Sequence, residues 1–189
     1  MFQLIKRLFA LIPQVEAHCD TADGPAVTDG RRALESGNLN HALKWIPADG
    51  ETELRHVFEQ AVVVRSLGAE AKEVADRLFL ETLVRIHRMA EGVGFTGIQG
   101  HGAAVEPVVT AADRALETGD LEPLRPLVPA DRFDELAHRF EHAREKKNFA
   151  VDDVMAGRDY IAAYVSYFKY AEGEDHHHAQ HAHAHGHHA

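Results

Sequence analysis

The 189-residue sequence predicts an all-α fold, in which two tandem copies of a multi-helix unit pack with pseudo-twofold symmetry. Three observations lead to this prediction. Apolar residues recur at helical spacing, period-two alternation is rare, and one sequence pattern occurs twice at an offset of 82 residues. We expect about eight short helices, followed by a disordered His-rich tail that has no large apolar residue to bury.

The duplication is visible in three short motifs and then continues through a helix. Pro-x-Val-Thr (25–28, 107–110), Arg-Ala-Leu-Glu-Ser/Thr-Gly (32–37, 114–119) and Pro-Ala-Asp (47–49, 129–131) each occur twice. After one deletion, both halves end in Ala-Glu-Gly. The predicted divisions are an N-terminal amphipathic segment or weak signal peptide (1–17), repeat 1 (18–92), a Gly-rich linker (93–102), repeat 2 (103–173) and the tail (174–189).

Each repeat carries the same helix boundary signals. In repeat 1, Pro25 suits a first helical turn, Gly37 suits a helix end, and Asp49 stands where its side chain could cap the next helix. The counterparts in repeat 2 are Pro107, Gly119 and Asp131. Both repeats should therefore begin with a helix of about three turns.

Apolar stripes predict the longer helices of each repeat. In repeat 1 they consist of Leu54, Phe58, Ala61, Val62 and Arg65, and of Val74, Leu78, Phe79, Leu83 and Ile86. In repeat 2 they consist of Phe133, Leu136 and Phe140, and of Ile161, Tyr164, Val165 and Phe168. We expect each half to bury its stripe against the other, so that either half alone would be unstable.

Composition excludes several classes of protein. The single cysteine, Cys19, rules out an intramolecular disulfide, and a net charge of −10 with scattered Lys and Arg argues against nucleic-acid binding. The sequence has no transmembrane span. It also lacks a phosphate-binding Gly loop, a nucleophile elbow, His-Glu-x-x-His and Cys-x-x-Cys.

The tail predicts binding of a transition metal ion, because neutral imidazoles are ligands for nickel, zinc and copper. Eight of the fifteen histidines lie there: His176, His177, His178, His181, His183, His185, His187 and His188. The alternative interpretation is a purification tag, although the irregular spacing is a poor design for one.

A second candidate metal site opens repeat 1, where His18, Cys19, Asp20 and Asp23 offer nitrogen, thiolate and carboxylate ligands. The matching positions of repeat 2 lack this set. Glu81 and His87, which face Ala and Phe in repeat 2, could complete the site.

Each of these residues also has a structural interpretation. Asp23 could cap the helix that begins at Pro25, His87 could be a hydrogen-bonded core histidine, and Glu81 could form surface ion pairs with Arg85 and Arg88.

Two resemblances follow from these residues. His-Cys-Asp-Thr-x-Asp-Gly-Pro (18–25), Glu-Thr-Leu-Val-Arg-Ile-His-Arg (81–88) and Lys-Asn-Phe (147–149) resemble an uncharacterised prokaryotic helical family of unknown function over residues 18–173, which implies no activity. Export signals of that family end just before His-Cys-Asp, similar to the Val-Glu-Ala junction at 15–17. His-Cys-Asp-x-x-Asp-Gly is similar to the nickel hook of nickel superoxide dismutase, with Asp23 in place of the second cysteine.

Three functions are consistent with the sequence. The first is a metal-binding protein for homeostasis, or for delivery of the ion to a metal-receiving protein. The second is a metal-dependent redox enzyme with an open position at Cys19. The third is a helical-repeat scaffold that binds a protein through a groove. The chain is expected to be cytoplasmic, or exported with cleavage after Ala17.

Overall fold

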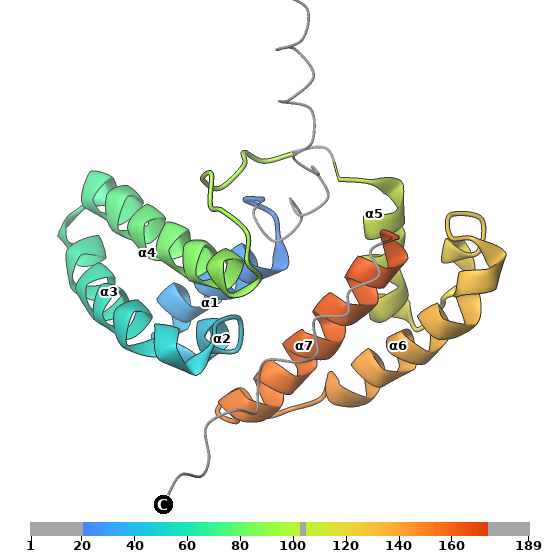
Figure 1. Ribbon diagram of the computed structural model, residues 1–189. Helices are drawn as coiled ribbons and strands as arrows, with labels where there is room; N and C mark the ends of the chain where they lie inside the picture. Colours follow the sequence, from blue (N-terminus) through green and yellow to red (C-terminus); the bar gives the residue numbers. More distant parts are fainter. Residues whose placement is uncertain (1–20, 103–104, 174–189) are drawn as a thin grey trace, which may run out of the picture. The chain divides into compact units, whose positions relative to one another are not determined.

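The computed structural model describes residues 21–102 and 105–173, which form seven α-helices joined by turns and short 3-10 helices (Figure 1). These residues contain one isolated parallel bridge, Thr21 to Gln99, and no β-strand, which confirms the all-α prediction. The chain divides into two compact units, unit 1 within residues 1–104 and unit 2 within residues 105–189. None of the described helices is long and apolar enough to cross a bilayer. The predicted segment 1–17 and the His-rich tail lie outside the described residues.

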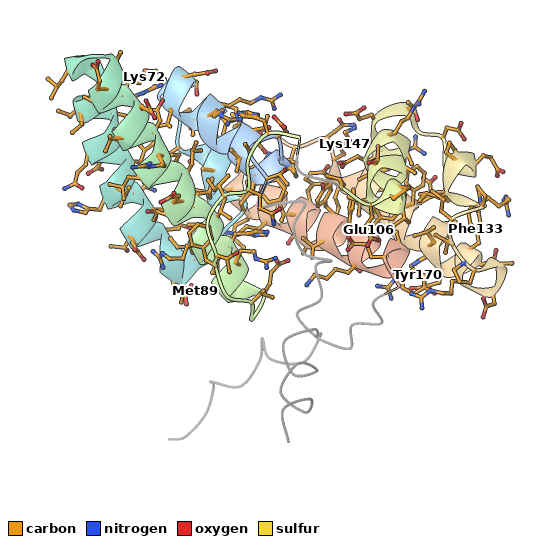
Figure 2. The ribbon with its side chains drawn as sticks, turned by 90° about the horizontal axis from the view of Figure 1, so that it is seen from above. Lys72, Met89, Glu106, Phe133, Lys147 and Tyr170 are labelled. Atoms are coloured by element: carbon orange, nitrogen blue, oxygen red, sulfur yellow. The ribbon has the colours of Figure 1, made fainter. Side chains whose placement is uncertain are left out.

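Unit 1 is built around a pair of long helices with a third packed on it. Its helices are α1 (Pro25–Ser36), α2 (Asn40–Leu43), η2 (Ala48–Gly50), α3 (Glu51–Val64), η3 (Arg65–Leu67) and α4 (Ala69–Ala90). Helix α4 packs against both α3 and α1. Figure 2 marks its two ends with Lys72 and Met89. The core includes Leu54, Phe58 and Phe79, and the Phe58 and Phe79 ring centroids are 5.4 Å apart.

Unit 2 has the same kind of arrangement, with a shorter last helix. Its helices are α5 (Pro107–Thr118), η4 (Glu122–Leu124), η5 (Ala130–Arg132), α6 (Phe133–Lys146) and α7 (Val154–Ala171). Helices α6 and α7 form the long pair, and α5 packs on both. Leu136, Phe140 and Tyr167 are buried between them, and the Phe140 and Tyr167 rings are 5.7 Å apart. Figure 2 places Phe133 and Tyr170 on this helix pair.

The predicted helix starts and ends of α1 and α5 are correct. Pro25 and Pro107 open these helices, and Gly37 and Gly119 follow them in the left-handed conformation, with φ of 72° and 81°. A glycine adopts this conformation without the steric cost of a Cβ atom.

The predicted capping of α3 and α6 by Asp49 and Asp131 is wrong. Both residues lie inside 3-10 turns that run directly into the helices. The residues that precede α3 and α6, Gly50 and Arg132, already have helical backbone angles and no side-chain cap. An N-cap side chain normally needs an extended residue at that point, and a continuous helical entry provides none.

The apolar stripes identify most of the core, but not all of their members are buried. Phe79, Leu83 and Ile86 are buried, whereas Val74 and Leu78 are 56% and 51% exposed. Their spacing on α4 turns these two side chains toward solvent, because Phe79 and Leu83 already occupy the face that meets α1 and α3.

Units 1 and 2 repeat their helix boundaries at the offset of the sequence motifs. The bounds of α5, η5 and α6 lie 82 residues after those of α1, η2 and α3. A cation also makes the same contact in both units. Arg65 donates to the backbone oxygen of Leu34 near the end of α1, and Lys147 donates to that of Leu116 near the end of α5, at 2.7 Å. A positive charge at a helix C-terminus stabilises the exposed carbonyl groups there.

Candidate functional site

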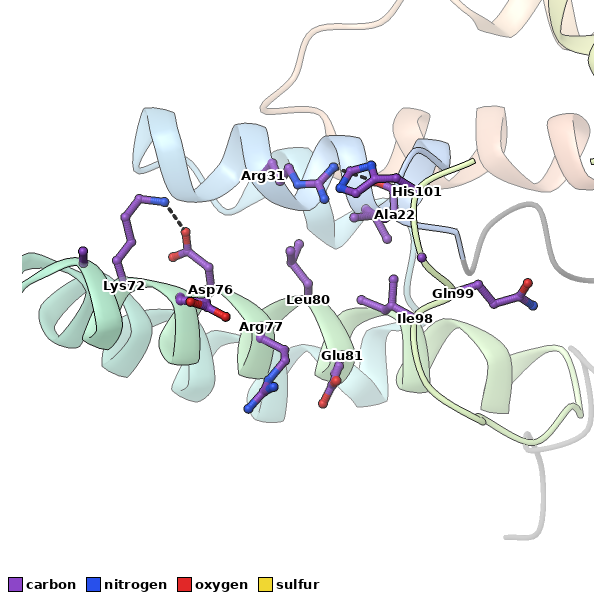
Figure 3. Close-up of a pocket in the computed structure, with 14 residues that line it drawn as sticks. Ala22, Arg31, Lys72, Asp76, Arg77, Leu80, Glu81, Ile98, Gln99 and His101 are labelled. Atoms are coloured by element: carbon purple, nitrogen blue, oxygen red, sulfur yellow. Dashed lines mark hydrogen bonds and ion pairs between the residues drawn. The ribbon is translucent and has the colours of Figure 1, made fainter. Parts of the chain in front are cut away.

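A polar groove in unit 1 lies beside the point where the His-Cys-Asp sequence joins the described fold. The groove has a volume of about 590 Å³ and is lined by α1, α4 and residues 98–101 (Figure 3). Its cationic side chains are Arg31, Lys72 and Arg77, and its carboxylates are Glu73, Asp76 and Glu81. The groove therefore presents both charges to a ligand.

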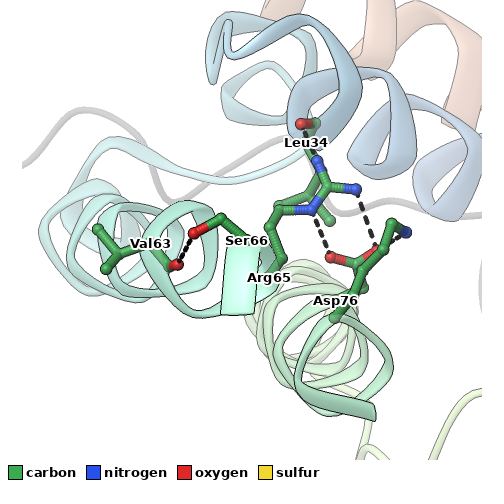
Figure 4. Close-up of polar contacts among 6 residues, drawn as sticks. Leu34, Val63, Arg65, Ser66 and Asp76 are labelled. Carbon is green, nitrogen blue, oxygen red and sulfur yellow. Dashed lines mark hydrogen bonds and ion pairs between the residues drawn. The ribbon is translucent and has the colours of Figure 1, made fainter. Parts of the chain in front are cut away.

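One wall of the groove is held by an ion-pair network. Asp76 accepts hydrogen bonds from Arg65 Nε at 2.9 Å and Nη2 at 3.1 Å, and from Lys72 Nζ at 2.5 Å. Arg65 also donates to the Leu34 carbonyl, which ties α4 to the end of α1 (Figure 4). Both oxygens of the Asp76 carboxylate therefore accept hydrogen bonds within the protein, so Asp76 stabilises the fold and is not a candidate ligand for a bound ion.

The opposite wall is formed by two chain segments that are far apart in sequence. The Ala22 N–H donates to the Gln99 carbonyl at 2.8 Å, and the Arg31 guanidinium donates to the Ala22 carbonyl at 2.5 Å. Figure 3 shows Arg31, Ala22 and His101 together at this end of the groove. Residues 98–102, predicted as part of a linker, are packed in unit 1 against residues 21–23.

Asp23 is hydrogen-bonded to His101, which is one of the residues that line the polar groove. His101 Nδ1 lies 2.6 Å from Asp23 Oδ1, and the Gly102 N–H donates to Asp23 Oδ2 at 3.1 Å. The His101 hydrogen bond, followed by that from Gly102, holds the pKa of the Asp23 carboxyl below its usual value. Asp23 is therefore ionised at neutral pH, and it accepts a hydrogen bond at each oxygen.

The interpretation of Asp23 as the cap of α1 is wrong. The residue before that helix is Gly24, and no side chain caps the helix there. Pro25 at the first position has no N–H to cap, and the Asp23 carboxylate binds residues 101–102 instead.

Of the other predicted ligands, Glu81 and His87 lie in different surroundings. Glu81 is half-buried and lines the polar groove. The expected Glu81 to Arg85 ion pair does not form, because Arg85 pairs with Glu53 of α3. Six residues of α-helix separate Glu81 and His87 by about 9 Å along the axis and turn them to different faces.

His87 is in the core, at 4% exposed. Its Nδ1 is 2.9 Å from the Trp45 carbonyl oxygen, and its ring meets the Trp45 ring edge-on at a centroid distance of 5.6 Å. Its Nε2 is 3.8 Å from Glu91 Oε2. These contacts agree with the alternative interpretation of His87 as a hydrogen-bonded histidine of the core.

The remaining predicted ligands lie outside the described residues. They are His18, Cys19 and Asp20, and all eight tail histidines from His176 to His188. Within residues 21–102 and 105–173, no three His, Cys, Asp or Glu side chains are grouped so that they could hold a metal ion.

His101 was not among the predicted site residues. Its sequence signal was weak, because a single histidine between two glycines has no ligand spacing around it. The contact with Asp23 spans 78 residues and exists only in the folded chain.

A second, apolar groove lies on the other side of α4. It has a volume of about 640 Å³ and is lined by His56, Glu59, Gln60, Ala61, Val63, Val64, Val74, Ala75 and Leu78 of α3 and α4. Val63, Val74 and Leu78 are more than half exposed. Exposed apolar side chains gathered in one groove are typical of a surface that binds a partner.

Comparison with known proteins identifies a family. Neither a curated protein nor a solved structure matches the chain. Residues 23–170, which include Asp23, His101 and all of the residues that line the polar groove except Ala22, match a family of unknown function, DUF6448. Since the match covers most of the 189 residues, the chain belongs to the DUF6448 family of unknown function.

Proposed function

We propose that the protein binds a transition metal ion, nickel, zinc or copper, for metal homeostasis or delivery to a receiving protein. The observation that carries the proposal is the density of imidazoles in residues 176–188, where eight histidines occur within thirteen positions. Such a segment needs no preformed fold, because ligands can gather around the ion as it binds.

The second binding site in this proposal is the His18-Cys19-Asp20 motif. A thiolate with imidazole and carboxylate neighbours suits zinc, nickel and copper, and the resemblance to a nickel hook adds nickel to the candidates. The described fold supports this part of the proposal because the chain directly after the motif is anchored by Gln99 and Arg31. When the adjoining residues are held in place, a side chain that coordinates the ion loses less conformational entropy on binding.

Metal analysis by mass spectrometry tests the proposal. Protein purified without an affinity tag is compared as the full chain, as a chain ending at Asp175, and as that shortened chain with Cys19→Ala. We expect several metal equivalents in the full chain, one tightly bound equivalent after truncation, and none after truncation combined with Cys19→Ala. An unchanged stoichiometry in all three would contradict it.

We also infer that the two units are copies of one duplicated helical unit. The equal offset of the helix bounds and the matched Arg65 and Lys147 contacts support this. Packing of the copies about a pseudo-twofold axis stays a prediction.

Binding of a protein partner is a second candidate function, and the apolar groove is the observation that favours it. We propose that the occupant is an amphipathic helix with a basic polar face. Apolar side chains at i, i+3, i+4 and i+7 would cover Val63, Val74 and Leu78, while Lys or Arg would meet the exposed carboxylate of Glu59.

A synthetic peptide of residues 1–17 has this composition and serves as the probe, because Lys6 and Arg7 lie between apolar residues. We expect the peptide to bind and Val63→Glu to weaken binding at least tenfold by fluorescence anisotropy. Met155→Glu is the matched control, since Met155 is equally exposed, at 65%, but lies in unit 2. Binding that is absent, or equal in both variants, would exclude this second function.

A further inference from the structure

We propose that the polar groove of unit 1 binds a small zwitterion with an apolar body, either a free amino acid or a short peptide with free ends. In this proposal Arg31 of α1 binds the carboxylate of the ligand, and Glu81 of α4 binds its ammonium group. Every residue that lines the groove lies within the described part of unit 1. Binding at this site needs no metal ion and is independent of the proposed metal-binding function.

The groove has the size of a site for a small molecule. Its volume of about 590 Å³ falls within the roughly 300–1,000 Å³ that is typical of pockets for small ligands. Two of its walls are the helices α1 and α4, and the third is the segment 98–101. The hydrogen bond from the Ala22 N–H to the Gln99 carbonyl, at 2.8 Å, holds this third wall in place.

The charges in the groove favour a ligand that carries one charge of each sign. Lys72 and Asp76 pair with each other, and Asp76 also pairs with Arg65. The other charged side chains of the groove are two cations and two carboxylates: Arg31, Arg77, Glu73 and Glu81. Among the described residues, the last three of these make no hydrogen bond or ion pair. Because these four charges balance, electrostatic complementarity favours a zwitterion over a simple anion or cation.

Arg31 is suited to bind a carboxylate because its guanidinium is held at one edge and open at the other. Its Nη1 donates to the Ala22 carbonyl oxygen at 2.5 Å, and the residue is half-buried. Its Nε and Nη2 have no hydrogen-bond partner among the described residues. Asp23 does not occupy this edge, since its two oxygens accept from His101 and Gly102. Such an edge can donate two parallel hydrogen bonds to a carboxylate.

An apolar surface lies between the two charged groups of the proposed site. Figure 3 shows Leu80 and Ile98 in the space between Arg31 and Glu81. Glu81 follows Leu80 directly on α4 and is half-buried. Because its carboxylate has no partner to release, the Glu81 side chain can change rotamer to meet an ammonium group. A ligand that covers Leu80 and Ile98 also gains affinity from the burial of its own apolar body.

Unit 2 lacks this pair of charges but keeps the apolar residues around it. The positions that match Arg31 and Glu81 are Asp113 and Ala162. Val27 and Leu80 of the groove are matched by Val and Ile, at positions 109 and 161. The helical unit therefore does not need the two charges of unit 1 in order to fold, as is expected of residues that serve a ligand.

Isothermal titration calorimetry of the full chain, stripped of metal, tests the inference. The probes are L-leucine and the dipeptide Leu-Leu, which distinguish a free amino acid from a peptide. Each probe is also used with its amino group acetylated and with its carboxylate amidated. The variants are Arg31→Gln and Glu81→Gln. Their controls are Arg32→Gln and Glu70→Gln, since these are exposed residues of the same two helices that do not line the groove.

We expect at least one of the two zwitterions to bind, and its blocked forms to bind at least about tenfold more weakly, because each loses a charge-assisted hydrogen bond. Arg31→Gln should remove the preference for a free carboxylate, Glu81→Gln should remove the preference for a free amino group, and the controls should keep both. Thermal unfolding is measured in parallel, because Arg31 also holds Ala22. Glu81→Gln should leave it unchanged, so this variant reports on binding alone.

Two results would overturn the inference. The first is that neither L-leucine nor Leu-Leu binds to the unaltered chain. The second is that a zwitterion binds but Glu81→Gln binds it as tightly as Glu70→Gln does, with the same preference for a free amino group. In either case the metal content of the chain is unaffected, so the proposed metal-binding function is tested separately.

Discussion

Residues 62–64 at the end of α3 are Val-Val-Val, whereas residues 144–146 at the matching end of α6 are Arg-Glu-Lys. Helices α3 and α6 end at equivalent positions of the two repeats. Phe58 of α3 and Phe140 of α6 are also equivalent, and both are buried in the core. The charged version in unit 2 shows that the fold does not require valine there. The valines of unit 1 therefore need another explanation, and the apolar groove that Val63 and Val64 line offers one.

Each unit has a carboxylate that is at least half-buried, and the contacts of these two carboxylates differ. In unit 1, the buried Asp29 accepts from Trp45 Nε1 at 2.9 Å and pairs with Lys44 at 2.9 Å. In unit 2, Asp113 accepts a hydrogen bond from the Tyr164 hydroxyl at 3.2 Å, and burial raises its pKa to about 6. Asp29 therefore has a cationic partner, and Asp113 has a raised pKa because it is shielded from water.

The largest expected loss of stability comes from a substitution in the core of unit 1. Phe79→Ala removes a fully buried ring and should lower the free energy of unfolding by about 3–5 kcal/mol. Tyr160, at the matching position of α7, is only half-buried, so Tyr160→Ala should cost less. Denaturant unfolding measures both. Equal losses would show that the two positions are equivalent, contrary to their burial.

Hydrogen exchange of the Phe79→Ala variant tests whether the stability of unit 2 depends on unit 1. The sequence predicts that each half depends on the other. Exchange should then accelerate in α6 and α7 as well as in unit 1. Protection that falls in unit 1 alone would show that unit 2 is stable independently.

The next effect is a pH dependence specific to unit 2. Since the folded-state pKa of Asp113 is raised above its unfolded value, its contribution to stability is greatest below about pH 4 and is lost as the pH rises through about 6. Asp113→Asn should stabilise unit 2 by about 1–2 kcal/mol at pH 8 and have little effect at pH 4. Denaturation at the two pH values measures this, and a destabilised Asn variant at pH 8 would contradict it.

A smaller effect is expected where both units make the same contact with different cations. Arg65→Lys should keep the bond to the Leu34 carbonyl but lose the paired hydrogen bonds to Asp76, at a cost of about 1 kcal/mol. Lys147→Arg should gain nothing, because the position matching Asp76 in unit 2 is Gly157. Thermal unfolding of the two variants checks this asymmetry, and a stabilised Lys147→Arg would refute it.

The smallest effect is expected at the surface that distinguishes the units. Val63→Glu introduces the residue found at the matching position 145, and Val63 is 65% exposed. The free energy of unfolding should change by less than about 0.5 kcal/mol. A loss well above 1 kcal/mol would mean that the valine stabilises the fold, and the argument for a binding groove would fail.

Much of the fold was predictable because its signals are local. Pro25 and Gly37 act through their own backbone geometry, and the stripe of Leu54 and Phe58 reports helical spacing directly. Val74 and Leu78 were wrongly assigned to the core, since a stripe shows which residues share a face but not where the neighbouring helices stop covering it.

The candidate site was less predictable. Glu81 does line the polar groove, but no local pattern in the sequence indicated that Asp23 would contact His101, which lies 78 residues away. For His87 the core role was the stronger interpretation, and its burial and its contact with the Trp45 carbonyl oxygen agree with that role. Such choices depend on which distant groups come within hydrogen-bonding distance, and that is not encoded in spacing.

By itself, the sequence determined the all-α class, the first and last residues of α1 and α5, and the chemical types available for metal binding, because each depends on residues that are neighbours along the chain. Only the tertiary structure decided that residues 98–102 fold onto residues 21–23, that His87 is buried, and that α3 and α4 leave an apolar groove. These features arise when helices pack, since packing fixes which faces lose contact with water and which polar groups must find partners.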